Sequence, residues 1–417
     1  MSATEWRAPG TRLGPWNPGA RRMNHSSPTA ILLNIGHAMD HWILVVFAYS
    51  WGVIAGVWGV EWTELTPFNY GALFMFGAGS IVSGRLGDHW GRWIMMVIFF
   101  VGMGVSSLII ALCTNKWQIG VALTLMGAFA SIYHPVGIPM LVQKARNPGF
   151  TIGVNGLAGN MGIAIAAGLS VYIAQRFGWQ MAFILPGVIC LVCAVAFVIL
   201  VPREEEAPAK RKPKMNDLPP SVLARIFAIM TFTAVTGSII FNFTTNGNGE
   251  LLRERVKGAV EDPAELAIML FVIFSLASLA QLVVGKLIDR FPLKSVYLPI
   301  LFLQVPLFLI ASQVEDWGLF ITAIGFMLLV FGAIPFTDAM IVKYIDDRMR
   351  SRVTGARLAI GFGVSSIVVA LIGPTVKAAG FPVLLMVLAG VAFLGFCAIS
   401  MLPGERDMSQ AALKPAE

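Results

Sequence analysis

Four polar side chains share one face of the first long apolar segment. They recur three or four residues apart, as Asn34, His37, Asp40 and His41, and this spacing places side chains on a single face of an α-helix. A carboxylate beside two imidazoles can bind and release a proton near neutral pH. We interpret Asp40, with His37 and His41, as a proton-coupling group. The alternative is a hydrogen-bonded cluster that only fixes helix packing.

Further polar groups interrupt the other apolar segments, at His134, Asn160, Asn242, Asn246 and Arg357. Ionisable groups at membrane depth cost at least about 2.5–3.5 kcal/mol each, which makes them functional candidates. We expect these five to line a polar substrate-binding cavity. The alternatives are amide hydrogen bonds between helices and, for Arg357, pairing with Asp338 or snorkelling to the surface.

The composition requires a solvent other than water. The chain of 417 residues is 57% hydrophobic and only 13% charged, whereas soluble domains average about 25% charged residues. A membrane-spanning helix needs about 20 mostly apolar residues. The sequence accordingly predicts an all-α membrane protein with twelve transmembrane helices, over 29–57, 66–84, 93–113, 117–143, 150–175, 179–201, 221–249, 264–288, 293–313, 317–343, 351–376 and 382–402.

A charged, proline-flanked stretch at 202–220 divides these segments into six and six. We expect two pseudo-symmetric six-helix bundles joined by a solvated cytoplasmic linker. The resulting domains are a flexible cytoplasmic tail, two bundles with the linker between them, and a second cytoplasmic tail, over 1–28, 29–201, 202–220, 221–402 and 403–417. Residues 1–28 lack the apolar core and cleavage site of a signal peptide.

Lysine and arginine predict the orientation. With both termini inside, the inner segments carry 23 of these residues, the outer loops carry 6, and Arg357 lies within a helix. Cytoplasmic loops of membrane proteins are enriched in such residues. We expect a multi-pass protein of the cell inner (plasma) membrane with cytoplasmic termini. The charged run 346–352 is interpreted as a solvated loop with local ion pairs.

A charged hairpin between the second and third segments, residues 84–92, reads Gly-Arg-Leu-Gly-Asp-His-Trp-Gly-Arg. It recurs 201 residues later as Gly-Lys-Leu-Ile-Asp-Arg, residues 285–290. Glycines permit a tight turn, a carboxylate can face the dipole of a helix N-terminus, and an arginine can pair with a carboxylate across the bundle. The candidate residues here are Gly84, Asp88, Gly91, Arg92, Asp289 and Arg290.

The hairpin, its repeat and the twelve segments resemble the major facilitator superfamily of transporters. That resemblance implies two parallel six-helix repeats with a substrate site between them, and a hairpin that latches the cytoplasmic gate shut. His89 and Trp93 depart from the family pattern, where basic residues are usual.

The first half is most similar to the fosmidomycin-resistance exporters. The likeness rests on His37 and Asp40, on 132–135 (Ile-Tyr-His-Pro) and on 159–162 (Gly-Asn-Met-Gly). It implies proton-driven antiport of small, often anionic compounds. An importer of a metabolite anion such as an organic acid is the alternative, and a transporter-like membrane sensor is a remote one.

The sequence lacks the motifs of several other classes of protein. There is no phosphate loop and no Gly-x-Ser-x-Gly turn, so we expect no enzyme and no cofactor. No metal site is expected, because no third ligand is evident beside His37, Asp40 and His41. Cys190 and Cys193 lie in an apolar segment without a second ligand pair. The expected partners are a small-molecule substrate, protons and lipid, with no nucleic acid, and the chain is expected to be a monomer.

Overall fold

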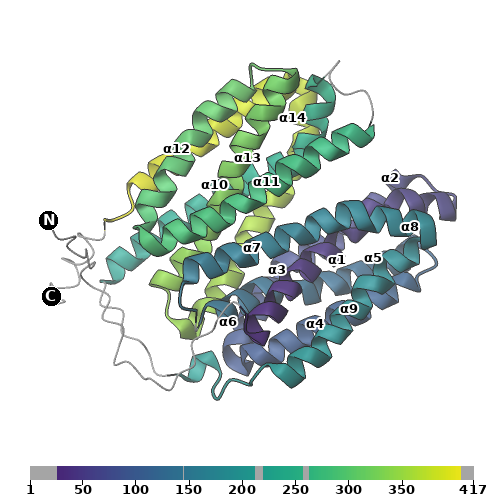
Figure 1. Cartoon of the computed structure of the whole chain (residues 1–417), viewed down its shortest axis with the longest axis horizontal. Coiled ribbons are helices and arrows are strands. Elements are labelled where there is room, and N and C mark those ends of the chain that lie inside the picture. Colours follow the sequence, from purple (N-terminus) through teal and green to yellow (C-terminus); the bar gives the residue numbers. More distant parts are fainter. Residues whose placement is uncertain (1–25, 144, 212–218, 257–262, 405–417) are drawn as a thin grey trace.

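The computed structural model describes residues 26–143, 145–211, 219–256 and 263–404, and the regular elements in this part of the chain are helices (Figure 1). In chain order, the first half holds α1 (Pro28–Trp58), α2 (Trp62–Leu65), η1 (Thr66–Asn69), α3 (Tyr70–Trp90), α4 (Arg92–Ala111), α5 (Lys116–Ala130), η2 (Tyr133–Gly137), α6 (Ile138–Val142), α7 (Pro148–Ile165), η3 (Ala166–Ser170), α8 (Val171–Phe177) and α9 (Trp179–Leu200). The linker contributes η4 (Pro208–Lys210), and the second half holds α10 (Pro220–Arg255), α11 (Pro263–Arg290), α12 (Leu293–Ala311), α13 (Asp316–Tyr344), η5 (Asp347–Met349) and α14 (Arg350–Ser400).

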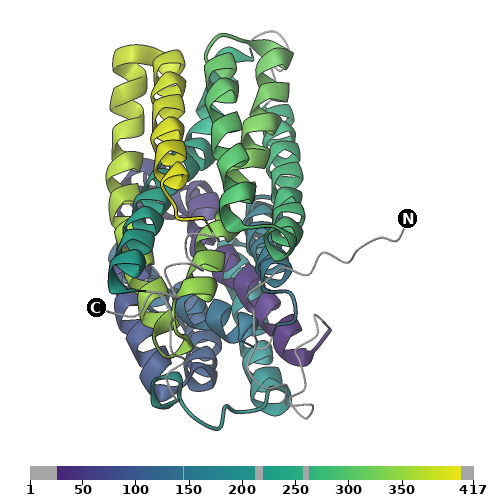
Figure 2. The same ribbon diagram turned by 90° about the vertical axis from the view of Figure 1, so that its left-hand side faces the viewer.

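Each half has a hydrophobic core of its own. One core is built from residues of 30–201, and the largest core of the second half is built from residues of 240–392. Figure 1 shows the two halves side by side, and in the perpendicular view of Figure 2 most of the second half (green to yellow) lies above the first half. The predicted fold class, an all-α membrane protein with two pseudo-symmetric six-helix bundles, is confirmed.

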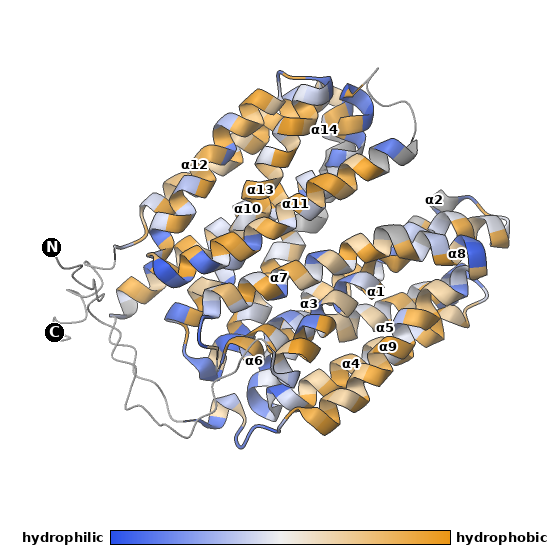
Figure 3. Cartoon of the chain, viewed as in Figure 1, coloured by the Kyte–Doolittle hydropathy of each residue, from blue (hydrophilic) through white to orange (hydrophobic). Residues whose placement is uncertain are grey.

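Hydropathy follows the helices. Within the described residues, nine helices are long and apolar enough to cross a membrane. Figure 3 shows apolar residues along the helix lengths and hydrophilic residues gathered toward the helix ends and loops. Large apolar side chains such as Val192, Val195 and Ile199 of α9 are more than 60% exposed, as expected for surfaces that face lipid acyl chains rather than water.

Local chemistry sets the helix boundaries. Ser27 caps α1, because its hydroxyl accepts a hydrogen bond from the Ala30 amide at 3.2 Å, and Pro28 fits the first turn. Gly91 separates α3 from α4 with a φ of +105°, a value that L side chains rarely adopt. Gly380 interrupts α14 with a φ of +75°, so that the predicted eleventh and twelfth helices follow one another through a single kink.

Two predicted helices are not continuous. The segment 117–143 contains a π-turn, η2, between α5 and α6, and the segment 150–175 contains another, η3, between α7 and α8. In the first case Pro135 lies inside the turn and Pro139 just beyond it. Proline lacks the amide that an α-helix needs, so the wider turn accommodates it. Such turns occur often at functional sites.

The halves meet chiefly through two helix pairs, α3 with α14 and α7 with α11. Glycines let the backbones touch. A Cβ on Gly84 would lie 2.4 Å from the carbonyl oxygen of Ser351, and one on Gly285 would lie 2.5 Å from the carbonyl oxygen of Gly149. The two pairs are related by the sequence repeat, since Gly84 and Gly285 are the equivalent positions in the two hairpins. We call the part of the molecule that carries these contacts the hairpin end.

The described part of the predicted linker is largely exposed or half-buried, but two of its residues pack against the rest of the chain. Its first part forms η4 with a buried Pro208, and Arg211 binds residues at the hairpin end. Residues 212–218 of the predicted linker, residues 1–25 of the first tail and residues 405–417 of the second tail lie outside the described residues.

Candidate functional site

Three imidazoles and one carboxylate converge inside the first half. His37, Asp40 and His41 come from α1, and His134 comes from η2. The Nε2 atoms of His41 and His134 are 3.2 Å apart, and Nε2 of His134 lies 3.8 Å from Oδ2 of Asp40. The rings of His37 and His41 lie 4.8 Å apart, as do those of His37 and His134. We call this group the histidine cluster.

Asn155 of α7 orients the cluster. Its backbone carbonyl lies 2.7 Å from Nδ1 of His37. Because a carbonyl only accepts, Nδ1 must carry the proton, which leaves Nε2 as the free position of the neutral ring. The Asn155 side chain donates to the Tyr133 hydroxyl at 2.7 Å and to the Asn34 side-chain oxygen at 2.9 Å. Asn155 was missed in the sequence, although an amide in an apolar segment is a usable signal.

The Asp40 carboxylate is buried without a hydrogen-bond donor. Its exposure is 0%, and among the described residues neither carboxylate oxygen has a hydrogen-bond partner. An isolated buried carboxylate costs several kcal/mol when it is charged. The site therefore favours a bound cation at Asp40, and a proton is the simplest one.

A small-residue face on α7 makes room for the cluster. A Cβ on Gly159 would lie 2.7 Å from the ring of His37, and one on Gly162 would lie 2.2 Å from the backbone oxygen of Ala38. Glycine at both positions lets α7 approach α1 closely. His37 is also stacked on the ring of Tyr133, with centroids 4.7 Å apart. The position of His37 is thus fixed on two sides.

Among the amides that have buried atoms without partners in the described part of the chain, two lie on α7 and α11. They are Nδ2 of Asn160 on α7 and both side-chain polar atoms of Gln281 on α11. Gln281 faces the same small-residue stripe, because a Cβ on Gly156 would meet its Oε1. Buried amides normally find partners, so these atoms are available to a ligand. The sequence indicated Asn160 but missed Gln281.

The remaining predicted substrate-binding residues belong to the second half. Asn242 of α10 donates to the carbonyl oxygen of Ser238 at 2.9 Å. Asn246 follows one turn later on α10, and its side chain lies outside what the structure describes. Arg357 of α14 pairs with Asp338 at 2.8 Å and also donates to the Thr337 hydroxyl. Of the alternatives for Arg357, pairing with Asp338 is the one present in the structure.

At the hairpin end, each repeated aspartate caps a helix of the opposite half. Oδ2 of Asp88 accepts from the Arg352 amide at 3.0 Å, at the start of α14. Asp289 accepts from the amides of Gly149 and Phe150 at 2.8 Å each, at the start of α7. The first amides of a helix lack internal partners and favour a negative charge. These contacts hold the two halves together at this end.

Arg92 is fully buried in the same region. It donates to a carboxylate oxygen of Asp347 at 2.9 Å and to the backbone oxygen of Asp347 at 2.8 Å. It also donates to the Ser351 hydroxyl at 3.2 Å, and Asp88 lies 3.8 Å away. Arg290, its counterpart in the second hairpin, is exposed. The repeat therefore preserves the aspartate caps but not the buried arginine.

Residues 346–352 form the local ion pairs that were expected, but Asp347 shows that this segment is not only a solvated loop. Its carboxylate joins Arg92, Arg211 and Arg350. Burial raises its pKa, but the three guanidinium groups outweigh burial, and the net pKa is lowered below its ordinary value. Asp347 is thus the carboxylate that Arg92 was expected to find across the bundle.

The two departures from the family hairpin have different surroundings. His89 is exposed. Trp93 is buried, its indole nitrogen donates to the Val201 carbonyl at 2.9 Å, and its amide donates to Glu204 at 2.9 Å. Glu204 in turn binds Arg211 at 2.7 Å. Trp93 therefore anchors the start of the linker where the family pattern has a basic residue.

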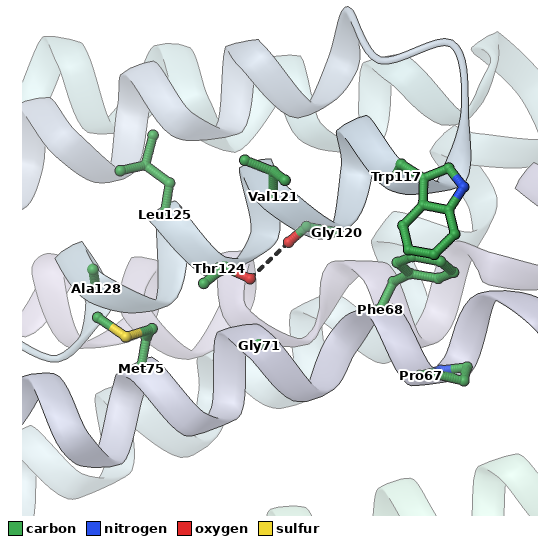
Figure 4. Close-up of a pocket in the computed structure, with 10 residues that line it drawn as sticks. All are labelled: Pro67, Phe68, Gly71, Met75, Trp117, Gly120, Val121, Thr124, Leu125 and Ala128. Atoms are coloured by element: carbon green, nitrogen blue, oxygen red, sulfur yellow. Dashed lines mark hydrogen bonds between the residues drawn. The ribbon is translucent and has the colours of Figure 1, made fainter.

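One apolar groove lies away from all of these residues (Figure 4). It runs between α3 and α5, and its lining is Pro67, Phe68, Gly71, Met75, Trp117, Gly120, Val121, Thr124, Leu125 and Ala128. The Thr124 hydroxyl is directed to the carbonyl oxygen of Gly120 within its own helix. The lining is mostly apolar and includes none of the predicted site residues, so the groove does not extend the candidate site.

The two-bundle helical fold, with polar groups buried inside it, defines a membrane transporter. A model of the Major Facilitator Superfamily matches residues 30–252, just over half of the 417-residue chain, and the chain belongs to that superfamily. It spans a membrane and is a transporter, not an enzyme.

Relatives and solved structures agree with this assignment. The multidrug resistance protein MdtG of Citrobacter koseri is 23% identical over 339 residues, covering 76% of this chain and 80% of that protein. The 4-hydroxybenzoate transporter PcaK of Pseudomonas aeruginosa is 28% identical over 156 residues, covering 35% of this chain and 33% of that protein. The proton:xylose symporter XylE shares the fold, with a TM-score of 0.74 at 11% identity, over 90% of this chain and 95% of the other.

Proposed function

We propose that this transporter is a proton-coupled exporter of a small organic solute that works by alternating access. It lies in the inner (plasma) membrane with both termini and the hairpin end in the cytoplasm, as the lysine and arginine distribution favours. The observation that carries the proposal is the buried Asp40 carboxylate, which has no hydrogen-bond donor of its own and lies 3.8 Å from Nε2 of His134.

Asp40 is the proton carrier in this mechanism. A proton neutralises the buried carboxylate, and its loss leaves a charge that the low-dielectric site tolerates poorly. His37 and His41 extend the pathway, because both lie on the same face of α1 and His41 is in hydrogen-bond contact with His134. Moving one charge through the membrane potential yields about 2.3 kcal/mol per 100 mV, which is enough to drive modest accumulation.

Substrate binding uses polar groups of both halves. His134 and Asn160 contribute from the first half, and Asn242, Asn246 and Arg357 contribute from the second. A site divided in this way is accessible from alternate sides when the halves rock against each other. The cytoplasmic gate is formed by Gly84, Asp88, Gly91, Arg92, Asp289 and Arg290. Its cross-bundle caps hold one side shut.

Export is favoured by the first half of the chain, which resembles the fosmidomycin-resistance exporters, and by the relative named a multidrug resistance protein. Import of an organic acid is the second candidate. It is favoured by the partly buried guanidinium of Arg357, which would recognise a carboxylate, and by the relative named a 4-hydroxybenzoate transporter.

The test is transport by purified protein in proteoliposomes under an imposed pH gradient. Fosmidomycin and 4-hydroxybenzoate are supplied in turn, and internal pH is followed with a trapped dye. We expect substrate-dependent proton movement with one of them, and at least a tenfold loss of gradient-driven flux in Asp40→Asn.

The matched control is Glu64→Gln, which neutralises an exposed carboxylate between α1 and α3. It should leave the flux unchanged. Substrate flux that persists undiminished in Asp40→Asn would show that proton coupling does not depend on that residue. The sign of the pH change on substrate addition separates antiport from symport, and therefore export from import.

A further inference from the structure

The histidine cluster brings together three possible metal ligands, one of which is far from the other two in the sequence. One ring nitrogen from each of His37, His41 and His134 lies within 4.8 Å of the other two. We propose that these three imidazoles, with Asp40 as a neighbouring counter-charge, bind one borderline divalent transition-metal cation such as Zn²⁺ or Co²⁺. This site goes beyond the proposed transport function and does not depend on it.

The spacing of the ring nitrogens suits tetrahedral coordination. Zn–N bonds of about 2.0–2.1 Å place two ligands on one tetrahedral ion about 3.3 Å apart. Nε2 of His41 and Nε2 of His134 are already 3.2 Å apart. The third nitrogen is within reach of a small side-chain adjustment, because the widest separation in the set is 4.8 Å.

The surroundings of His37 match those of a metal ligand. Its Nδ1 donates to the Asn155 carbonyl at 2.7 Å, and its Nε2 has no hydrogen-bond partner among the described residues. Metal-binding histidines almost always donate their other ring nitrogen to a carbonyl or a carboxylate, which fixes the tautomer and directs the lone pair. His37 therefore presents a buried lone pair held in a set direction.

Charge and ligand type select the class of cation. The unpartnered carboxylate of Asp40 lies 3.8 Å from the His134 nitrogen, so that a positive ion among the imidazoles would neutralise it. Imidazole nitrogens suit Zn²⁺, Co²⁺, Ni²⁺ and Cu²⁺, whereas Mg²⁺ and Ca²⁺ require oxygen ligands. His41 and His134 are only partly buried, so an ion can reach the two outer ligands before it contacts His37.

This set of three ligands could not be predicted from the sequence, because only two imidazoles and one carboxylate are close together in the chain. His134 is 93 residues from His41, and the π-turn at η2 brings its ring to α1. The expectation that the protein has no metal site rested on the absence of a third partner. The fold supplies one.

The chain offers an unusually clean test, since it contains only five histidines. Full-length protein is purified without a histidine tag in detergent and titrated calorimetrically with ZnCl₂ and with MgCl₂. The double variant His25→Gln/His89→Gln removes the two histidines outside the cluster. We expect one Zn²⁺ per chain in wild type and in this control, and no Mg²⁺ binding.

The single variants His41→Gln and His134→Gln should each weaken Zn²⁺ binding at least tenfold. A Co²⁺ complex with intense visible absorption, lost in the same variants, would show tetrahedral nitrogen ligation. Melting curves and gel filtration establish that these variants are folded. The proposal is overturned if folded His41→Gln and His134→Gln bind Zn²⁺ as wild type does, or if the control loses the binding.

Failure of this site and failure of the transport proposal are separable. Metal binding is measured at equilibrium in detergent with no gradient, whereas proton-driven flux is measured in vesicles in buffer containing EDTA. A protein that binds Zn²⁺ but moves no protons supports the metal site alone, and the converse result supports proton coupling alone.

Discussion

The hairpin end and the histidine cluster each bury charged groups, but these groups have partners in the first region and lack them in the second. Arg92 and Asp88 are fully buried, and their polar atoms meet helix amides, a hydroxyl or an opposite charge. Asp40 is equally buried, yet within the described residues its carboxylate has no hydrogen-bond partner.

This difference separates a structural contact from a binding site. A buried charge with a complete set of partners stabilises one arrangement of the two halves and gains nothing from a ligand. A buried charge without partners is costly until a cation arrives. On this reasoning the hairpin end holds a conformation, and we propose the histidine cluster as the place where an ion binds and leaves.

Breaking the buried ion pairs of the hairpin end should have the largest effect on stability. Arg92→Ala leaves Asp347 and Asp88 without their buried guanidinium, and removing one partner of a buried ion pair costs about 3–5 kcal/mol. We expect a large fall in the melting temperature in detergent. We also expect faster hydrogen exchange in residues 80–92 and 347–355, because the caps at the start of α14 loosen.

Arg85→Ala is the matched control, since Arg85 belongs to the same hairpin and is exposed. Its melting temperature should stay close to that of wild type. Equal melting temperatures for Arg92→Ala and Arg85→Ala would mean that the buried network contributes nothing to holding the halves together. The hairpin end would then not be the more stabilising of the two regions.

Overpacking the histidine cluster should lower the stability by a smaller amount. The Cβ of Gly159→Ala would lie 2.7 Å from the His37 ring, and an added carbon in a packed interior costs about 1–3 kcal/mol. The ring of His37 must shift away from its contact with Asn155. We therefore expect a modest loss of thermal stability together with weaker Zn²⁺ binding in the calorimetric assay.

Gly52→Ala in α1 is the control for helix propensity, because a Cβ there meets nothing within 4 Å. Alanine in a helix interior is favoured over glycine by about 0.5–1 kcal/mol, so this variant should be as stable as wild type or slightly more so. Unchanged metal binding in Gly159→Ala would indicate that His37 is not a ligand.

Much of the fold could be predicted from the sequence, because its determinants are local. Apolar length predicts each span, and the charged stretch after Val201 predicts the division between halves. The repeat at Asp88 and Asp289 predicts equivalent hairpins. Each of these features can be found within a few tens of residues, and the membrane environment permits few alternatives to a helix.

The candidate site could be predicted only in part, since its members meet through the fold. The helical spacing of His37, Asp40 and His41 was visible in the chain. Asn155 was not recognised, because its role depends on a backbone carbonyl that reaches α1 from α7. Asp347 was taken for a loop residue, because its partner Arg92 is 255 residues away.

The smallest effect should come from Asp347, because its side chain is 24% exposed whereas that of Arg92 is fully buried, and water screens its charge. This effect can be tested by pH. Its pKa is lowered in the folded protein by Arg92, Arg350 and Arg211 against the effect of burial. A lowered carboxyl pKa stabilises the fold above the unfolded value of about 3.9, and this stability is lost as pH falls through the folded-state pKa. Asp347→Asn should melt below wild type at pH 7, and the difference should shrink as the pH approaches 3.

Glu205→Gln, at an exposed linker position, should show no such convergence. If the Asp347→Asn difference is the same at pH 7 and pH 3, the ionised carboxylate does not stabilise the hairpin end, and its caps alone must hold the halves together.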